Sequence, residues 1–160
     1  MGIDPGLKAT GWAVVKSEKS GTTLIDVGVV QTSQKDDIHH KLHSIFSELC
    51  SVAKKHVIAV ASIENVFVNS NPKASMYLCY GRCAAILAMM ECKIDIFEYS
   101  PTKIKKCVFG SGHASKDQIA FMVNSTLSRP VSLNISNHST DAIGAALCHI
   151  FSTRHTSGIL

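Results

Sequence analysis

The sequence has no hydrophobic run long enough to cross a membrane. Its longest apolar stretch, from Cys83 to Met90, is far shorter than the roughly 20 residues that a spanning helix needs. The segment from Met1 to Gly6 has neither the basic part nor the apolar part of a secretory signal. We therefore expect a cytoplasmic protein, and we expect its six cysteines to be free thiols.

Several motifs of well-known chemistry are also missing. Cys79 and Cys83 are spaced as a helical metal site can be, but no CxxC pair or second set of ligands accompanies them. The sequence contains no Walker-type phosphate loop and no nucleophile elbow. These absences argue against a structural zinc site, a P-loop nucleotide site and a serine hydrolase.

The composition is that of a folded domain with a slight positive charge. The chain has 160 residues, of which 46% are hydrophobic and 18% charged, and this predicts one domain, residues 1–155, with a short tail, residues 156–160. Lysine and arginine number 16 against 12 acidic residues, a net charge of +4. Such a balance is compatible with a polyanionic partner without requiring one.

The hydrophobic pattern changes along the chain from strands to an alternation of helices and strands. Strand-forming segments come first, and after Lys35 apolar residues recur at helical spacing. Capping signals at Ser100-Pro101 and at Ser115 predict two further helix starts. The pattern predicts an α/β fold with a mixed sheet covered by helices. The expected strands are Gly2–Asp4, Gly11–Val15, Thr22–Val30, Val57–Ile63 and Ile94–Phe97, and the main expected helices are Ile38–Val52, Pro72–Cys92 and Thr140–Phe151.

One predicted helix is apolar on nearly every side. Between Met76 and Met90 polar residues are few, and Gly81 and Arg82 are the main interruptions. A helix of this kind usually has two buried faces. It is either a central core helix or a helix with one face on the sheet and the other on a partner subunit.

Three carboxylates and a histidine are candidates for a metal site. Asp4 and Glu64 each end a predicted strand, and His138 lies three residues before Asp141 near the last helix. Carboxylates that converge repel one another unless a cation lies among them, and oxygen ligands favour Mg²⁺ or Mn²⁺. Taken singly, each residue also fits an ordinary role as a turn residue, a helix cap or an ion-pair partner.

Basic residues gather in the second half of the chain. Lys103, Lys105 and Lys106 share one short predicted helix, and Lys116 follows a glycine-containing loop. A loop of this kind that leads into a helix can bind phosphates through backbone N–H groups and lysines. The alternative is a solvated lysine face. Phe67 could stack on an unpaired base or serve as a core residue.

In order along the chain, these motifs resemble those of the RuvC family of Holliday junction endonucleases. The similarity runs over nearly the whole chain. It rests on Gly2-Ile3-Asp4-Pro5-Gly6 with Thr10-Gly11, Ser62-Ile63-Glu64-Asn65-Val66-Phe67, Asn71-Pro72-Lys73 with Gly81-Arg82, Phe97-Glu98-Tyr99, Gly110 to Gln118, and His138-Ser139-Thr140-Asp141-Ala142. In family members several apolar residues precede the first glycine, whereas only Met1 does so here, so the first strand is either trimmed or shortened.

The resemblance implies a ribonuclease H-like fold with a five-stranded mixed sheet flanked by helices. It implies a homodimer, joined through the Met76–Met90 helix, that resolves four-way DNA junctions in recombination and repair by paired symmetric nicks with 5′-phosphate ends. Two Mg²⁺ ions, replaceable by Mn²⁺, would act at each site. The RuvA–RuvB branch-migration complex would be a partner, at the bacterial nucleoid. The implied metal-binding and catalytic residues are Asp4, Glu64, His138 and Asp141, and the implied DNA-binding residues are Phe67, Lys73, Arg82, Lys105 and Lys116.

Two other functions are weighed against this one. A chain with an incomplete first strand could bind junctions without cutting them. An actin-like or sugar-kinase ATPase also begins with an Asp-x-Gly strand end, but it needs a second domain and a second glycine-rich phosphate loop, for which this chain has no room.

Overall fold

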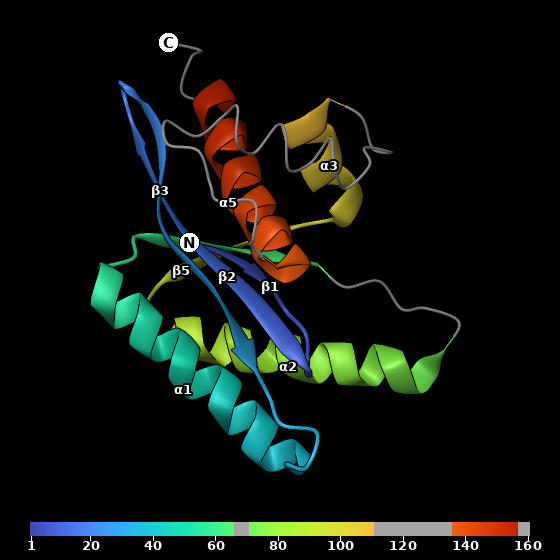
Figure 1. The fold of residues 1–160 in the computed structure, drawn as a ribbon. Coiled ribbons are helices and arrows are strands. Elements are labelled where there is room, and N and C mark those ends of the chain that lie inside the picture. Colours follow the sequence, from blue (N-terminus) through green and yellow to red (C-terminus); the bar gives the residue numbers. More distant parts are fainter. Residues whose placement is uncertain (66–70, 111–135, 157–160) are drawn as a thin grey trace.

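A computed structural model describes residues 1–65, 71–110 and 136–156. The centre of the molecule is a five-stranded sheet in the order β3-β2-β1-β4-β5 (Figure 1). Strands β1 (Gly2–Asp4), β2 (Ala9–Glu18) and β3 (Gly21–Gln31) form an antiparallel meander, whereas β4 (Val60–Glu64) and β5 (Asp95–Tyr99) run parallel to β1. This confirms the predicted mixed sheet, with a first strand of only three residues.

Helix α1 (Ile38–His56) begins where the helical spacing predicts. Asp37 caps it by accepting a hydrogen bond from the backbone N–H of His40. The helix ends at Val57, a residue that is 89% exposed and whose backbone is left-handed (φ 51°). The expected strand from Val57 to Ile63 is therefore wrong at its start. The first residues of that apolar run close the helix, and β4 begins only at Val60.

Helix α2 (Pro72–Glu91) follows the prediction closely, with Asn71 as its cap and Pro72 in the first turn. One face packs against α1 and the sheet through buried residues such as Ala85 and Met89. The opposite face is exposed although it is apolar: it presents Met76, Leu87 and Met90, along with Cys79 and Cys83. In the single chain, α2 is thus not buried on two faces.

Helices α3 (Pro101–Phe109) and α5 (Asn137–Thr156) complete the described structure. Ser100 caps α3 as its sequence predicts. The last helix begins at Asn137 rather than near Thr140, because the Ser136 hydroxyl accepts a hydrogen bond from the backbone N–H of Ser139 and caps an earlier turn. The helix that we expect from Ser115 lies outside the described residues.

The sheet separates two hydrophobic cores (Figure 1). Helices α1 and α2 cover one face, where Ile45, Leu49 and Ile63 are fully buried. Helices α5 and α3 cover the other, and a buried hydrogen bond of 2.9 Å between Tyr99 Oη and His149 Nδ1 joins β5 to α5. All six cysteines are free, as predicted. Among the described helices, none has the length and apolar character that a bilayer crossing requires.

Candidate active site

Two of the predicted acidic residues lie at the ends of adjacent strands. Strands β1 and β4 are parallel and in register, with Ile3 opposite Ile63, and the next residues are Asp4 and Glu64. Ile3 and Ile63 are fully buried, whereas the side chain of Asp4 is 16% exposed. The core on both sides therefore fixes the strand ends, and their carboxylates emerge together where the sheet meets solvent.

Helix α5 brings the other two residues to the same place, and two glycines allow it to come so close. A Cβ atom on Gly11, which is paired with Asp4 in the sheet, would lie 2.0 Å from the carbonyl oxygen of His138. A Cβ atom on Gly2 would lie 1.9 Å from the carbonyl oxygen of Ala142. Real Cβ atoms do not approach this closely, so larger residues would push the start of α5 away from the strands.

His138 contacts Asp4 directly. The imidazole Nδ1 lies 2.7 Å from Asp4 Oδ2. An ionised carboxylate can only accept, so the histidine N–H is the donor of this hydrogen bond. With Nδ1–H donating to Asp4, the Nε2 atom of a neutral imidazole carries the lone pair that can bind a ligand or accept a proton.

The pKa of Glu64 lies well above the ordinary value of a glutamate. Burial raises its pKa to about 8, and the negative charges of Asp4 and Asp141, together with a hydrogen bond to Asp4, act in the same direction. Lys105 lowers the pKa, which places its charge near this cluster. Glu64, Asp4 and Asp141 thus interact electrostatically, as the sequence predicts, and a proton on Glu64 relieves their repulsion.

The donor set of this cluster suits a hard divalent cation. Carboxylate oxygens are the ligands that Mg²⁺ and Mn²⁺ prefer, and crowded carboxylates favour a cation among them. Within residues 1–65, 71–110 and 136–156 no three such side chains are already arranged as a coordination shell. Asp4 is hydrogen-bonded to His138 and to Glu64, whose raised pKa favours the protonated form. A cation would take the place of that proton.

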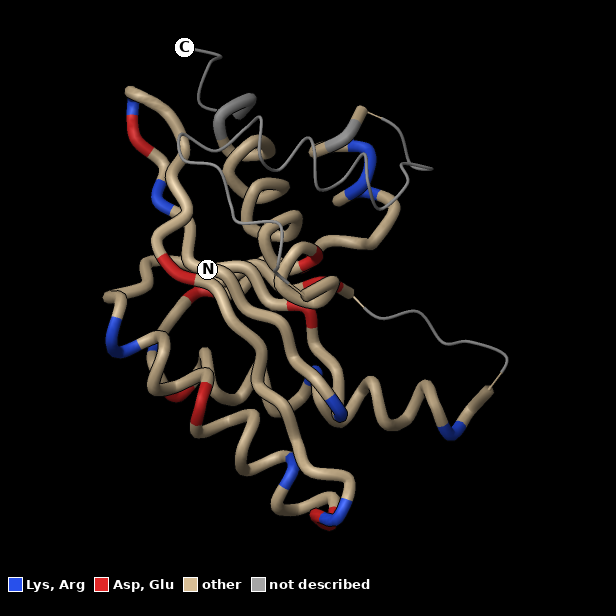
Figure 2. The backbone as a smooth tube through the Cα atoms, in the orientation of Figure 1, with Lys and Arg blue, Asp and Glu red and all other residues tan. Residues whose placement is uncertain are grey.

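Basic residues lie next to the acidic cluster. In Figure 2 acidic positions gather at the middle of the molecule, where the sheet meets the start of α5, and basic positions lie on α3. Lys105 is half-buried on α3 and is close enough to act on Glu64. Lys103 and Lys106 are exposed and line a separate hollow with Phe151. Of the three lysines on α3, Lys105 is thus the one that lies at the acidic site.

The other predicted DNA-binding residues are spread more widely. Lys73 is exposed in the first turn of α2, with its Nζ atom 6.0 Å from the centre of the Tyr77 ring. Arg82 forms an ion pair with Glu98 of β5 and is largely covered. Phe67 and Lys116 lie outside the described residues, as does the loop after Gly110.

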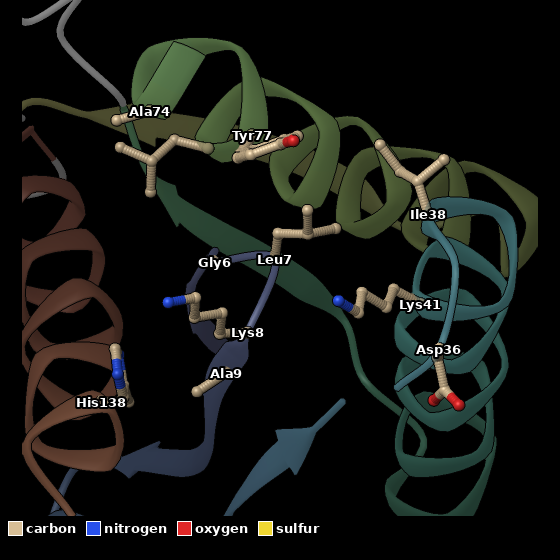
Figure 3. Close-up of a pocket in the computed structure, with 11 residues that line it drawn as sticks. Gly6, Leu7, Lys8, Ala9, Asp36, Ile38, Lys41, Ala74, Tyr77 and His138 are labelled. Carbon is tan, nitrogen blue, oxygen red and sulfur yellow. The ribbon is translucent and has the colours of Figure 1, made fainter. Parts of the chain in front are cut away.

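A cavity of about 630 Å³ adjoins the acidic site, and the motifs in the sequence did not indicate it (Figure 3). Its walls are the turn from Gly6 to Ala9, the N-terminal ends of α1 and α2, and His138. Gly81 keeps these walls together, because a Cβ atom there would lie 2.8 Å from the carbonyl carbon of Gly6. Its lining is distributed over four segments that are distant in the sequence, so no local sequence signal marks it.

The sheet order, the helices on both faces and the acidic residues at the strand ends define the class of ribonuclease H-like nucleases. Comparison with known proteins gives the particular family. The family model "Crossover junction endodeoxyribonuclease RuvC" matches residues 1–149. The chain belongs to the RuvC family, which confirms the predicted family, fold and class of enzyme, an endodeoxyribonuclease of crossover junctions.

Individual relatives agree with this assignment. The chain is 57% identical to the crossover junction endodeoxyribonuclease RuvC of Anaplasma phagocytophilum, over 99% of this chain and 98% of the relative. It is similar to RuvC from T. thermophilus in complex with a Holliday junction substrate, with a TM-score of 0.89, 25% identity and coverage of 98% and 94%. A second structure of Thermus thermophilus RuvC has a TM-score of 0.85 and 26% identity, covering 97% of this chain and 95% of that one.

Proposed function

We propose that this chain resolves four-way DNA junctions by hydrolysing two opposed strands at phosphodiester bonds. The observation that carries the proposal is the convergence of Asp4, Glu64, His138 and Asp141 at the ends of β1 and β4 in a member of the RuvC family. The similar T. thermophilus protein is in complex with a Holliday junction substrate.

Asp4, Glu64 and Asp141 would hold the divalent cations, with Mg²⁺ in the cell and Mn²⁺ as a substitute, two per site. When bound, such ions lower the pKa of water and stabilise the departing oxygen. His138 orients Asp4 through Nδ1, and its free Nε2 can take part in metal binding or proton transfer at the attacking water. Lys105, beside Glu64, would bind a phosphate next to the scissile bond.

DNA contacts would extend from this site along both sides. We propose that Lys73 binds the backbone at the start of α2 and that Phe67 and Lys116 complete the interface. Arg82 is already paired with Glu98, so its role in binding DNA would require that pair to open.

A second copy of the chain would cover the exposed apolar face of α2. Met76, Leu87 and Met90 are 47%, 60% and 62% exposed on one long helix, and a contiguous apolar surface of this kind is typical of an interface. A two-fold dimer would offer one active site to each of two opposed strands of a junction. We further propose that residues 1–155 act as one nuclease domain in the bacterial cytoplasm, together with RuvA and RuvB.

The test is incubation of the protein with an end-labelled four-way junction, with and without Mg²⁺. Paired symmetric nicks that need Mg²⁺ support a resolvase, and the variant Glu64→Gln should bind the junction but leave it uncut. The exposed variant Glu48→Gln is the matched control and should cut normally. A mobility shift without nicks in any divalent ion would contradict the proposal and favour the junction-binding alternative.

A further inference from the structure

The cavity beside the active site is continuous with it. His138 contacts Asp4 on one side and lines the cavity on the other. The turn that carries Lys8 begins directly after Asp4-Pro5, and the Thr10 hydroxyl stiffens it by donating a 2.7 Å hydrogen bond to the Gly6 carbonyl oxygen. A linear polymer bound at the acidic cluster would therefore extend from the active site into this cavity.

Two lysines from different elements give the cavity its charge. Lys41 in α1 directs its ammonium group into the space in front of the turn, and the ammonium group of Lys8 lies on the side of the turn that faces His138 (Figure 3). Neither forms an ion pair with a carboxylate in the part of the chain that the structure describes. Asp36 also lines the cavity, but its carboxylate points away from Lys41 (Figure 3). The two cations are thus available to an anion.

The remaining wall is apolar and partly aromatic. Ala74, Tyr77 and Leu78 come from the first turns of α2, and the Tyr77 residue is 39% exposed. Two cations spaced along a groove with an aromatic wall suit a single nucleic-acid strand, because phosphates pair with lysines and sugars or bases lie against the ring. A cavity of this volume is large enough for a drug-sized molecule, on the scale of a nucleotide.

We propose that this cavity binds the cut DNA strand immediately beside the scissile phosphate, with Lys8 and Lys41 on two neighbouring phosphates and Tyr77 against the intervening nucleotide. The inference rests on the proposed function, since it concerns the same substrate strand. It assigns the cavity the task of holding that strand in place while its neighbouring phosphate lies at the carboxylates.

The test combines lysine variants with neutral phosphate linkages to find which phosphate each lysine contacts. Four-way junctions would carry a neutral methylphosphonate at a single position, one, two or three linkages to either side of the cleavage site. Dissociation constants would be measured in Ca²⁺ for the wild type, Lys8→Gln, Lys41→Gln and the control Lys19→Gln, an exposed lysine at the tip of the β2–β3 hairpin. Thermal denaturation would verify that each variant is folded.

We expect Lys8→Gln and Lys41→Gln each to weaken binding about threefold to tenfold and to reduce the salt slope by about one, beyond any effect of Lys19→Gln. For each lysine, one neutral linkage should weaken binding by the wild type but not by that lysine's variant. Tyr77→Ala should weaken binding with an unchanged salt slope.

The outcomes separate the two proposals. Two results would show that the cavity does not bind the strand in a protein that cuts junctions in Mg²⁺. In the first, Lys8→Gln and Lys41→Gln have the same dissociation constants as Lys19→Gln. In the second, the binding free energies lost through the lysine change and through the neutral linkage add up at every linkage position. If the wild type neither prefers nor cuts junctions, the proposed function fails first and the strand assignment fails with it. Coupling of a lysine to one defined linkage supports the inference.

Discussion

Replacing Glu64 by glutamine tests the electrostatics of the acidic cluster apart from catalysis. The pKa of Glu64 is about 8 in the folded protein, against an ordinary value of 4.5. Between these pH values the folded chain keeps a proton that the unfolded chain has lost, so the free energy of unfolding falls as the pH rises. Because one pH unit corresponds to about 1.4 kcal/mol, the loss contributed by Glu64 reaches about 4 kcal/mol at pH 7.5.

A glutamine side chain cannot ionise and so escapes this loss. Its amide is nevertheless buried, and a buried amide without full hydrogen bonding costs about 1–3 kcal/mol. We therefore expect Glu64→Gln to raise the free energy of unfolding by about 2 kcal/mol at pH 7.5 in the absence of divalent ions. At pH 4.5 the gain should give way to a loss of about 1–3 kcal/mol, because near the ordinary pKa of glutamate the unfolded chain regains its proton and only the cost of the buried amide remains.

Urea denaturation in EDTA, followed by the fluorescence of the single tryptophan, Trp12, and by circular dichroism, measures the difference. The control is Glu48→Gln, an exposed glutamate on α1 that should change stability little at either pH. Added Mg²⁺ should stabilise the wild type, since the ion replaces the proton, and should stabilise Glu64→Gln less. A variant that is less stable than the wild type at pH 7.5, or indistinguishable from Glu48→Gln, would refute the argument that Glu64 is crowded by Asp4 and Asp141.

Three further predictions concern other parts of the molecule. Val57→Gly should stabilise the protein by about 0.5–1 kcal/mol, because an exposed β-branched residue now occupies a left-handed position, and a lower melting temperature would show that the side chain contributes packing. Gly11→Ala should reduce the rate of junction cleavage at least tenfold, because the new methyl group displaces the backbone of His138 and so misplaces the reacting groups slightly. Its circular dichroism should remain that of a folded chain. An unchanged rate would mean that α5 can shift without cost to the site. Leu87→Lys should convert a dimer to a monomer in sedimentation experiments, whereas Ile25→Lys, an equally drastic change on exposed β3, should not; equal masses for the two variants would argue against α2 as the interface.

Local signals predict most of the architecture. The starts of α1, α2 and α3 can be predicted from the sequence because their signals act within a few residues: the apolar spacing from Ile38 onward with Asp37 before it, Pro72, and the Ser100 cap. The predicted start of α5 is about one turn too late. The errors fall where a longer-range or competing interaction decides. The apolar pattern predicts a strand from Val57 onward. In the structure the Val57 N–H instead donates a hydrogen bond to the Ala53 carbonyl oxygen, so the first residues of the run belong to the end of α1.

The site shows the same division between local and distant effects. Each of the four metal-site candidates is a weak signal by itself, since Asp4 and Glu64 end predicted strands and His138 and Asp141 lie near the last predicted helix. Only their coincidence and the family resemblance join them. The sequence cannot show how they share charge: the high pKa of Glu64 depends on its burial and on Asp4 and Asp141, all distant in sequence. Lys8 and Lys41 carry no signal in the sequence, since each is an ordinary exposed-type residue until the fold places both beside one cavity.

The most direct measurement of the central claim is anomalous diffraction from crystals grown with Mn²⁺. We expect manganese peaks between the carboxylates of Asp4, Glu64 and Asp141, and we expect those peaks to disappear in Glu64→Gln crystals while the fold is unchanged. If the enzyme cuts junctions but manganese binds elsewhere and not at this cluster, the claim that these residues hold the catalytic metal is contradicted.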